Sequence, residues 1–190
     1  MKLERVLPYS KKIMKLALSE GDIAVDCTVG NGHDTLFLSE LVGKNGHVYG
    51  FDIQAEALSN TETLLAEHGV ESRVTLFEDS HAKVLERIPS EKHHLIRGAI
   101  FNLGYLPGGD KEIVTVPEST IEAVDSLLTV MEKEAVIVLV IYHGHPEGQV
   151  ERDALLDYVT KLDQKKAHVL QYRFMNQINN PPFIIAIEKK

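Results

Sequence analysis

The sequence predicts a single α/β domain: a mainly parallel sheet of seven strands with an antiparallel C-terminal strand and helices on both faces. Three observations predict it. Short apolar runs alternate five times with helical patterns, which is typical of a parallel sheet with crossover helices. The last two apolar runs have only residues 175–182 between them, too few for a crossover, so they form an antiparallel hairpin. A length of 190 residues suits one domain.

Each element follows from its own apolar pattern and from the glycines and prolines that end it. The strands are expected at residues 23–27, 47–52, 74–77, 98–101, 135–141, 168–174 and 183–188. Helices are expected at 34–42, 55–68, 84–88, 117–128 and 150–162, after an N-terminal helix that Ser10 could cap. We expect one domain, residues 1–190. Within it, residues 1–20 form the basic N-terminal helix, 21–145 the cofactor-binding core, and 146–190 the last helix and the hairpin.

Composition limits the class of protein. Hydrophobic residues make up 44% and charged residues 25%, as in soluble globular domains. No apolar run is long enough for a bilayer, so no membrane partner is expected. The single cysteine, Cys27, follows a buried strand, where a small apolar filler is favoured over a nucleophile. A single cysteine allows no internal disulfide, which suits a protein of the reducing cytoplasm. The formal net charge of -8 argues against indiscriminate nucleic-acid binding, although not against a local basic patch.

Such a patch occurs at the N-terminus. The basic residues there are Lys2, Arg5, Lys11, Lys12 and Lys15. Ile13, Leu16 and Ala17 would share the buried face of the helix. The patch is either a solvated helix face that covers the edge of the sheet or a surface that contacts phosphates. The sequence alone leaves both open.

The stretch 26–35, Asp-Cys-Thr-Val-Gly-Asn-Gly-His-Asp-Thr, joins the first strand to the first helix of the core. Gly30 and Gly32 allow positive φ and a close approach of a ligand to the backbone. The second strand ends in Asp52, where an acidic residue is placed to bind the hydroxyls of a ribose. The glycine turn and Asp52 together indicate a nucleoside-cofactor site. The alternative is a tight turn with capping side chains and no ligand.

The acidic residues decide between cofactors. A dinucleotide fingerprint has a third glycine where this chain has Thr35. Asp26 and Asp34 would repel a pyrophosphate, but they suit the ammonium and sulfonium groups of S-adenosylmethionine. A nicotinamide-dependent dehydrogenase is therefore disfavoured.

The other strand ends carry polar residues as well. Asp79, Ser80 and His81 follow the third strand, where Asp79 could accept from an adenine amino group or simply cap a helix. A glycine-rich loop, 102–110, follows the fourth strand, and residues 142–148 follow the fifth. Parallel strands bring all these loops to one edge of the sheet.

The order of elements resembles that of Rossmann-like class I S-adenosylmethionine-dependent methyltransferases. Residues 26–32 resemble their first motif, Asp52 the acidic end of their second strand, and Asp79-Ser80 their adenine-side position. Asn102-Leu103-Gly104-Tyr105 resembles the Asn-Pro-Pro-Tyr motif of amino-group methyltransferases, without its prolines. Three stretches, in 26–35, 101–111 and 142–145, together resemble the bacterial family once labelled putative rRNA methylase, over essentially the whole chain.

The resemblance implies a function. Members of that family include the tRNA methyltransferase that completes 5-methylaminomethyl-2-thiouridine at the wobble position. It therefore implies an N-methyltransferase that uses S-adenosylmethionine and acts on the anticodon stem-loop of tRNA. The alternatives are a methyltransferase for rRNA or for a small-molecule amine, and a non-catalytic cofactor-binding module. A homodimer is the default expectation for assembly.

These arguments assign roles to residues. Asn102 would accept an N–H of the amine, and Tyr105 and Tyr142 would stack on the substrate, with Tyr9 a further candidate. His143 would act as general base or would bond a phosphate or the base edge, and the alternative is that His143 and His145 only close a loop. The predicted cofactor-binding residues are Asp26, Thr28, Gly30, Asn31, Gly32, Asp34, Thr35, Asp52, Gln54, Asp79, Ser80 and His81. The predicted substrate-binding residues are Leu103, Gly104, Tyr142, Gly144, His145, Lys11 and Lys12. No metal is expected, because His143 and His145 have no third ligand at a supporting spacing.

Overall fold

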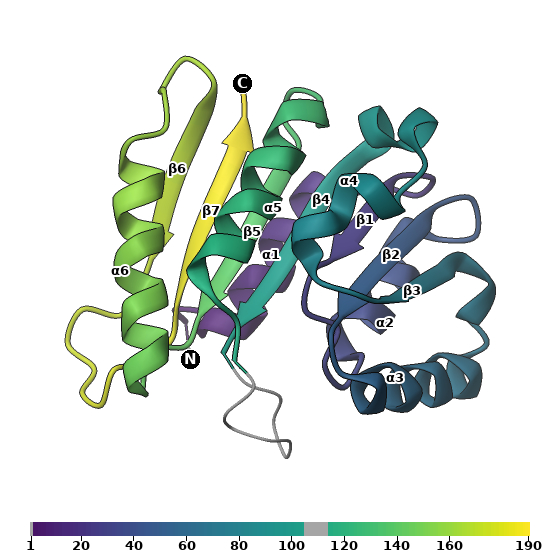
Figure 1. Cartoon of the computed structure of the whole chain (residues 1–190), viewed down its shortest axis with the longest axis horizontal. Coiled ribbons are helices and arrows are strands. Elements are labelled where there is room, and N and C mark those ends of the chain that lie inside the picture. Colours follow the sequence, from purple (N-terminus) through teal and green to yellow (C-terminus); the bar gives the residue numbers. More distant parts are fainter. Residues whose placement is uncertain (1, 105–113) are drawn as a thin grey trace.

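The computed structural model describes residues 2–104 and 114–190. One seven-stranded sheet runs through them in the order β3-β2-β1-β4-β5-β7-β6 (Figure 1). All the pairings of β1 to β5 are parallel, and β7 is antiparallel to both β5 and β6. The predicted fold class and the C-terminal hairpin are confirmed.

The elements lie close to their predicted positions. The strands are β1 (Ile23–Asp26), β2 (His47–Asp52), β3 (Val74–Glu78), β4 (Ile96–Leu103), β5 (Val136–Ile141), β6 (Ala167–Tyr172) and β7 (Phe183–Lys189). The α-helices are α1 (Val6–Ala17), α2 (His33–Val42), α3 (Ala55–His68), α4 (Val84–Arg87), α5 (Pro117–Val130) and α6 (Pro146–Thr160). Short 3₁₀ turns cover Glu71–Arg73, His81–Lys83 and Ser90–Leu95.

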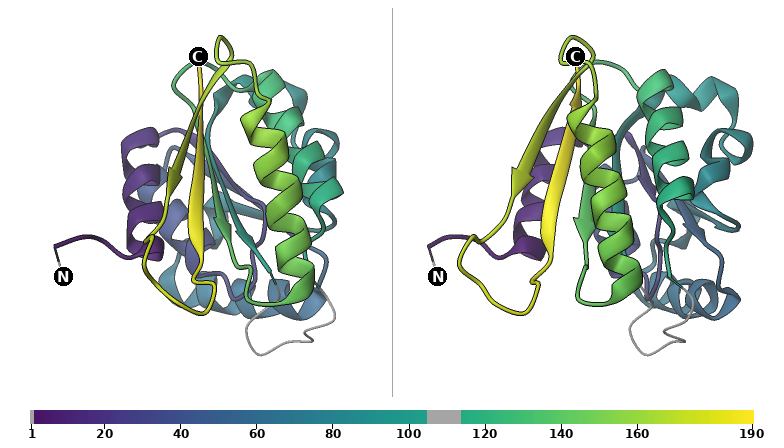
Figure 2. Two further views of the ribbon diagram at one scale, coloured as in Figure 1. Left: turned by 90° about the vertical axis from the view of Figure 1, so that its left-hand side faces the viewer. Right: turned by 60° about the vertical axis from the view of Figure 1, so that its left-hand side comes forward.

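Helices cover both faces of the sheet (Figure 2). Alternate side chains of each strand point to opposite faces, so the core has two halves. On one face, residues of α1 and α2 such as Met14 and Leu38 pack on Ala24 and Ile100. On the other face, residues of α4, α5 and α6 such as Leu127 and Leu155 join the larger half of the core. β5 lies in the interior of the sheet, as its wholly apolar sequence predicts.

Three local predictions were wrong. Ser10 does not cap α1, because the helix already begins at Val6; Ser10 is buried inside it and donates to the Leu7 carbonyl. Leu16, predicted for the core face, is 83% exposed, because the buried face of α1 follows Val6, Ser10 and Met14. α1 packs across β4, β5 and β7 rather than over the edge of the sheet.

Two elements depart most from their predicted ranges. β4 extends to Ile96 and Leu103 because both side chains are buried and the strand pairs with β5 through Leu103. α6 begins at Pro146, four residues before the predicted start, and a proline suits the first turn. Within the described ranges, no helix is long and apolar enough to cross a membrane.

Candidate functional site

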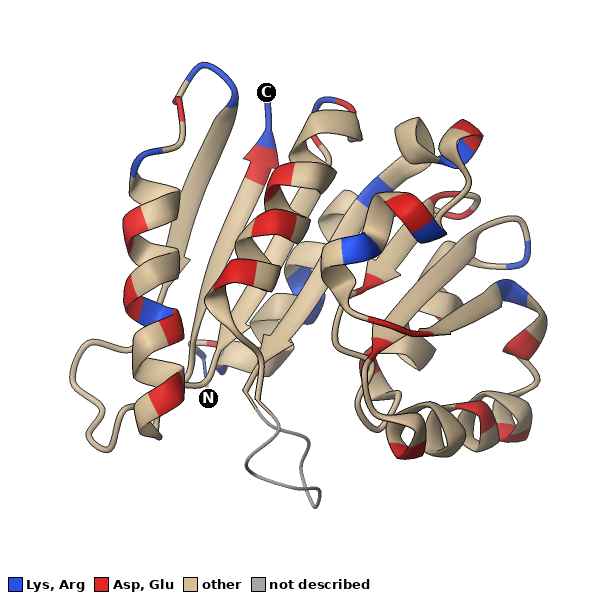
Figure 3. Ribbon diagram, in the orientation of Figure 1, with Lys and Arg blue, Asp and Glu red and all other residues tan. Residues whose placement is uncertain are grey.

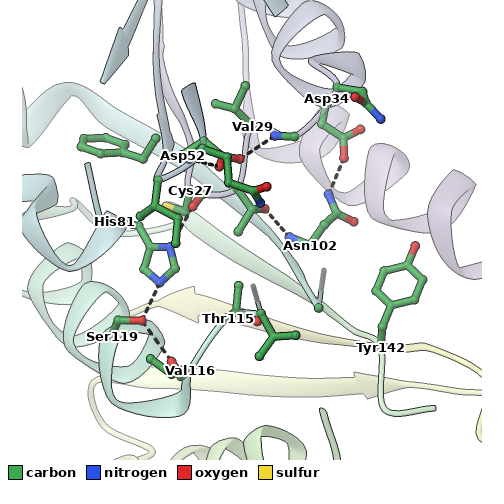
Figure 4. Close-up of a pocket in the computed structure, with 18 of the residues that line it drawn as sticks. Cys27, Val29, Asp34, Asp52, His81, Asn102, Thr115, Val116, Ser119 and Tyr142 are labelled. Atoms are coloured by element: carbon green, nitrogen blue, oxygen red, sulfur yellow. Dashed lines mark hydrogen bonds between the residues drawn. The ribbon is translucent and has the colours of Figure 1, made fainter. Parts of the chain in front are cut away.

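A cavity of about 930 Å³ opens at the carboxyl edge of the parallel strands (Figure 4). The loops after β1, β2, β3, β4 and β5 all contribute to its wall. It lies where the strand order changes direction between β1 and β4, which is the usual ligand-binding position in open α/β sheets. The wall includes these predicted residues: Lys11, Thr28, Gly30, Asn31, Asp34, Asp52, Gln54, Asp79, Ser80, His81, Asn102, Gly104, Tyr142, His143, Gly144 and His145.

The loop after β1 approaches β2 and α3 closely. Gly30 and Gly32 both have positive φ, 52° and 78°. A Cβ on Gly32 would lie 2.6 Å from Oγ1 of the buried Thr61, so only glycine fits there without a shift. The Thr61 hydroxyl donates to the Gly30 carbonyl at 3.2 Å. This packing holds the loop against α3, and it places Gly32 behind the wall of the cavity rather than in it.

Asp52 is fixed at the end of β2 by two backbone donors. One carboxylate oxygen accepts from the Gly30 N–H at 2.9 Å, and the other accepts from the Gln54 N–H at 3.0 Å. A carboxylate has about four lone-pair sites. Asp52 therefore keeps one acceptor site on each oxygen at the cavity wall, which suits two neighbouring hydroxyls.

Asp26 lies beneath the loop and is completely buried. Its carboxylate accepts from the Thr35 hydroxyl at 2.6 Å and from the Thr28 N–H at 3.1 Å. Burial, together with the negative charges of Asp34 and Asp52, raises the pKa of Asp26 to about 7. Asp26 and Thr35 thus form the foundation of the loop and do not line the cavity.

Asp79 has four donors around its two oxygens. Lys83 lies 3.0 Å from one oxygen, which also accepts from the Ser80 N–H, and Arg87 donates twice to the other, at 2.8 and 2.6 Å. These hydrogen bonds lower the pKa of Asp79 to about 2. The Ser80 hydroxyl accepts from the Ala82 N–H and so caps the following 3₁₀ turn. Asp79 is at the cavity wall, but its lone pairs already have protein partners.

His81 links three segments below the cavity. Its Nδ1–H donates to the Cys27 carbonyl at 2.8 Å, its Nε2 lies 3.2 Å from the Ser119 hydroxyl, and its ring packs edge-on against Phe101. Burial lowers the pKa of His81, so the ring is neutral near pH 7. His81 therefore fixes the start of α5 against the end of β1. Cys27 is buried, as predicted for a small apolar filler.

Asn102 is held on both sides at the end of β4. Its backbone N–H donates to the Thr28 hydroxyl at 2.7 Å, across the gap between β1 and β4. Its side-chain nitrogen donates to the Asp34 carboxylate at 2.6 Å (Figure 4). The other Asp34 oxygen forms an ion pair with Lys11 at 3.3 Å. Because the nitrogen of the amide faces Asp34, the amide oxygen is the acceptor that Asn102 keeps for a ligand.

The residues after β5 complete the wall. Tyr142 is 36% exposed, and burial together with the charge of Asp34 raises its pKa, so its hydroxyl stays protonated. His143 is buried, with Arg152 Nη1 at 3.3 Å from its Nδ1 and a hydrogen bond to the backbone of Pro181. Burial and the charge of Arg152 lower the pKa of His143. Its ring nitrogens thus already have partners in α6 and the β6–β7 loop.

Three further predicted side chains lie elsewhere. Leu103 packs in the hydrophobic core. Lys12 forms an ion pair with Glu4 at 3.1 Å and is not part of the wall. Tyr9 stacks on Tyr172 with ring centroids 4.0 Å apart, so its ring has a structural partner. Tyr105 lies outside the described residues.

Sequence reasoning missed several wall residues: Leu7, His33, Thr115, Val116, Ser119 and Asn180. Ser119 contacts His81, and Thr115 donates through its N–H to the Gly104 carbonyl at 3.0 Å and through its hydroxyl to the buried Glu151. No sequence spacing predicts these long-range contacts. Asn180 belongs to the β6–β7 loop, whose Asn-Asn-Pro-Pro run is a turn signal but no ligand signal. Across residues 2–104 and 114–190, no three His, Cys, Asp or Glu side chains are grouped to hold one metal ion.

This fold, with an acidic residue closing β2 and an asparagine closing β4 at one cavity, is that of a class I methyltransferase. The family model described as "Putative rRNA methylase" matches residues 48–188, and the chain belongs to that family. The structure superposes on a putative rRNA methylase from Clostridium thermocellum with a TM-score of 0.96, at 40% identity over 100% of both chains. It superposes on a putative methyltransferase from Streptococcus mutans in complex with SAH with a TM-score of 0.88, at 36% identity over 99% of both chains.

A curated relative carries a more specific name. The tRNA (mnm(5)s(2)U34)-methyltransferase, chloroplastic, of Arabidopsis thaliana is 31% identical over 187 residues, which is 94% of this chain and 67% of the relative. The protein is a methyltransferase that depends on S-adenosylmethionine. The site fits that cofactor, because Asp52 keeps an acceptor site on each oxygen beside a close-packed glycine loop.

Proposed function

We propose that this protein methylates a primary amine on tRNA, converting 5-aminomethyl-2-thiouridine at the wobble position to 5-methylaminomethyl-2-thiouridine. The observation that carries the amine class is the hydrogen bond from the Asn102 amide to the Asp34 carboxylate at 2.6 Å. The nucleotide is inferred from the name of the Arabidopsis relative. Family membership supports an RNA substrate.

The chemistry asks three things of the protein. When bound, S-adenosylmethionine supplies a methyl group on a sulfonium, which the lone pair of an amine can accept in one displacement. A primary alkylamine has a pKa near that of lysine, about 10.4, so it must lose a proton before it can react. The protein must therefore attract the ammonium form, favour the loss of one proton, and aim the remaining lone pair.

Asp34 and Asn102 suit these tasks together. The Asp34 carboxylate supplies a negative charge that attracts an ammonium group into this part of the cavity. The Asn102 oxygen can accept one N–H of the amine and so fix the direction of the lone pair. Alignment of the reacting groups can contribute up to roughly 7–11 kcal/mol to such a displacement.

The other polar side chains have supporting roles. Tyr142 keeps its proton, so its hydroxyl can donate to the substrate, and its ring can stack on a base. His143 was the predicted general base. Its contacts to Arg152 and Pro181 favour instead a role in positioning the end of β5. We therefore propose that solvent within the cavity, and not His143, accepts the proton that the amine loses.

The test is transfer of labelled methyl groups to unfractionated tRNA from cells that lack this protein, followed by nucleoside digestion and mass analysis. We expect a new peak of methylaminomethyl-2-thiouridine with the wild-type protein, and the same peak formed about 100-fold more slowly with Asn102→Ala. Binding of S-adenosylmethionine without any tRNA product would contradict the proposal. The same assay on rRNA and on small amines would then separate the remaining enzyme classes from a non-catalytic binding protein.

A further inference from the structure

The loop that joins β6 to β7, residues 173–182, lies at the same edge of the sheet as the cavity (Figures 1 and 2). Its Asn180 is part of the cavity wall. We propose that this β6–β7 loop, together with Arg152 of α6, is the surface that binds the RNA strand next to the nucleotide to be methylated. The inference rests on the proposed function, because it requires that the substrate is RNA.

The charges of this surface suit a phosphate. The protein has a formal net charge of -8, so an RNA strand must approach over a locally basic region. The β6–β7 loop has no acidic residue, and no red appears on it in Figure 3. Its one basic residue is the exposed Arg173. Arg152 and Arg173 both lie near enough to His143 for their charges to lower its pKa. Arg152 contacts His143 directly, and Arg173 is a second guanidinium whose charge acts on this imidazole of the cavity wall.

Arg152 keeps part of its guanidinium for a ligand. Its Nε donates to Asp153 at 2.7 Å, and its Nη1 contacts His143 at 3.3 Å. The Nη2 group is thus the part left to meet a phosphate oxygen. Because Asp153 offsets part of the charge of Arg152, Arg173 should contribute more to phosphate binding than Arg152 does.

The loop also exposes two large apolar side chains beside these charges. Met175 is 77% exposed and Ile178 is 81% exposed. Exposed apolar side chains of this size have the chemistry of a wedging surface for bases. Neither is part of the cavity wall, which the loop reaches through Asn180. We therefore expect an RNA strand that continues past the wall to contact them and a small amine inside the cavity not to.

The backbone fixes the shape of the last part of the loop. Asn179 and Asn180 both have positive φ, 65° and 48°, a conformation that asparagine adopts more readily than most residues. Pro181 and Pro182 then fix φ, and the backbone of Pro181 bonds to His143. Asn180 is therefore presented at the cavity wall on a rigid support, where its amide can both donate to and accept from the edge of a base.

The experiment compares loop variants with matched surface variants far from the cavity. Arg173→Glu and Ile178→Ser change the loop. The controls make matching changes on exposed side chains elsewhere. Lys44→Glu reverses a charge in the turn between α2 and β2, and Leu16→Ser replaces an apolar side chain near the end of α1. For each protein the measurements are Kd for tRNA from cells that lack the protein, the slope of that affinity against salt, kcat and KM for tRNA, and Kd for S-adenosylmethionine.

We expect Arg173→Glu to weaken tRNA binding about tenfold or more and to reduce the salt slope by about one. Ile178→Ser should raise KM for tRNA several-fold. The two controls should match the wild type, and Kd for S-adenosylmethionine should be unchanged throughout. The loop assignment is overturned if the wild type methylates tRNA and both loop variants bind it equally well. If the wild-type protein modifies no RNA, the proposed function itself fails, and the loop assignment fails with it.

Discussion

The carboxyl ends of β1 and β2 and the carboxyl ends of β4 and β5 hold their polar side chains in different ways. In the first region, Asp52 accepts two backbone N–H groups from nearby loops, and glycines pack against Thr61. In the second region, Asn102 depends on the side chains of Asp34 and Thr28, which are 68 and 74 residues away in the chain. The first region is set mainly by backbone groups of neighbouring loops, and the second by side-chain pairs that lie farther apart in the chain.

The difference suits the two ligands that the regions face. A cofactor of fixed shape is bound well by backbone groups, which hardly move. A reacting amine must be aligned to within a fraction of an ångström, and long-range pairs such as Asn102 with Asp34 lock a side chain in one orientation. Substitutions in the first region should therefore change cofactor affinity, and substitutions in the second should change turnover.

The largest effect is expected for Asn102→Ala. Loss of the amide removes the acceptor that aims the amine, and misalignment of this kind can lower kcat by about 100-fold. Cofactor affinity should stay within about twofold, because the backbone N–H that donates to Thr28 remains. Steady-state kinetics with tRNA and calorimetric titration of S-adenosylmethionine measure the two effects separately. Equal losses in both would show that Asn102 supports the whole cavity rather than the reacting group.

The next effect is expected for Asp52→Ala. It removes both acceptor sites at the cavity wall and leaves two backbone N–H groups without their carboxylate, so cofactor affinity should fall roughly 30-fold. Asp79→Ala is the matched variant on the neighbouring strand. Since Lys83 and Arg87 already occupy the oxygens of Asp79, its removal should weaken cofactor binding much less. Titration of both variants decides the comparison, and an equal loss would mean that Asp79 also binds the cofactor directly.

A smaller effect is expected for Asp34→Asn. The change removes the charge that pairs with Lys11 and weakens the hydrogen bond that orients Asn102, so kcat should fall about tenfold. Because the amine is attracted as an ammonium, KM should rise as well. Lys11→Met removes the ion pair and the cation–π contact with Phe37 but leaves the Asp34 carboxylate and its bond to Asn102 in place, so it serves as the control, with a change of less than about threefold. If Asp34→Asn behaved like that control, the orientation of Asn102 would not depend on Asp34.

The same difference between the regions explains what the sequence could predict. The order of strands and helices along the chain, the C-terminal hairpin, and the tight glycine turn after β1 follow from local patterns of apolar residues and glycines. The extent of β4 and the orientation of α1 did not, because tertiary packing decides which side chains are buried. The partners of Asp79 and His143 were also beyond local reasoning. They come from helices that the chain forms later, and no spacing rule connects Arg152 or Arg87 to a strand end.

The last prediction concerns stability rather than activity, and it tests whether the first region depends on a proton held by Asp26. The pKa of Asp26 is about 7 in the folded protein and near its ordinary value of 3.8 when unfolded. Between these values the folded state binds more protons than the unfolded state, so this group stabilises the fold fully below pH 3.8 and less and less as pH rises to 7. The difference corresponds to roughly 4 kcal/mol. Asn at this position keeps one acceptor, and the Thr35 hydroxyl can reverse its hydrogen bond.

The stability of Asp26→Asn relative to the wild type should therefore increase between pH 4.5 and pH 7.5, by at least roughly 1–2 kcal/mol in urea unfolding. Asp79→Asn is the control with the opposite shift. Its folded pKa of about 2 lies below the ordinary value, so its contribution changes only at more acidic pH, and its difference from the wild type should be flat over this range. Parallel stability curves for Asp26→Asn and the wild type would show that the loop after β1 rests on an ionised carboxylate. In that case the hydrogen bonds from Thr35 and Thr28 would stabilise the ionised form of Asp26 rather than its protonated form.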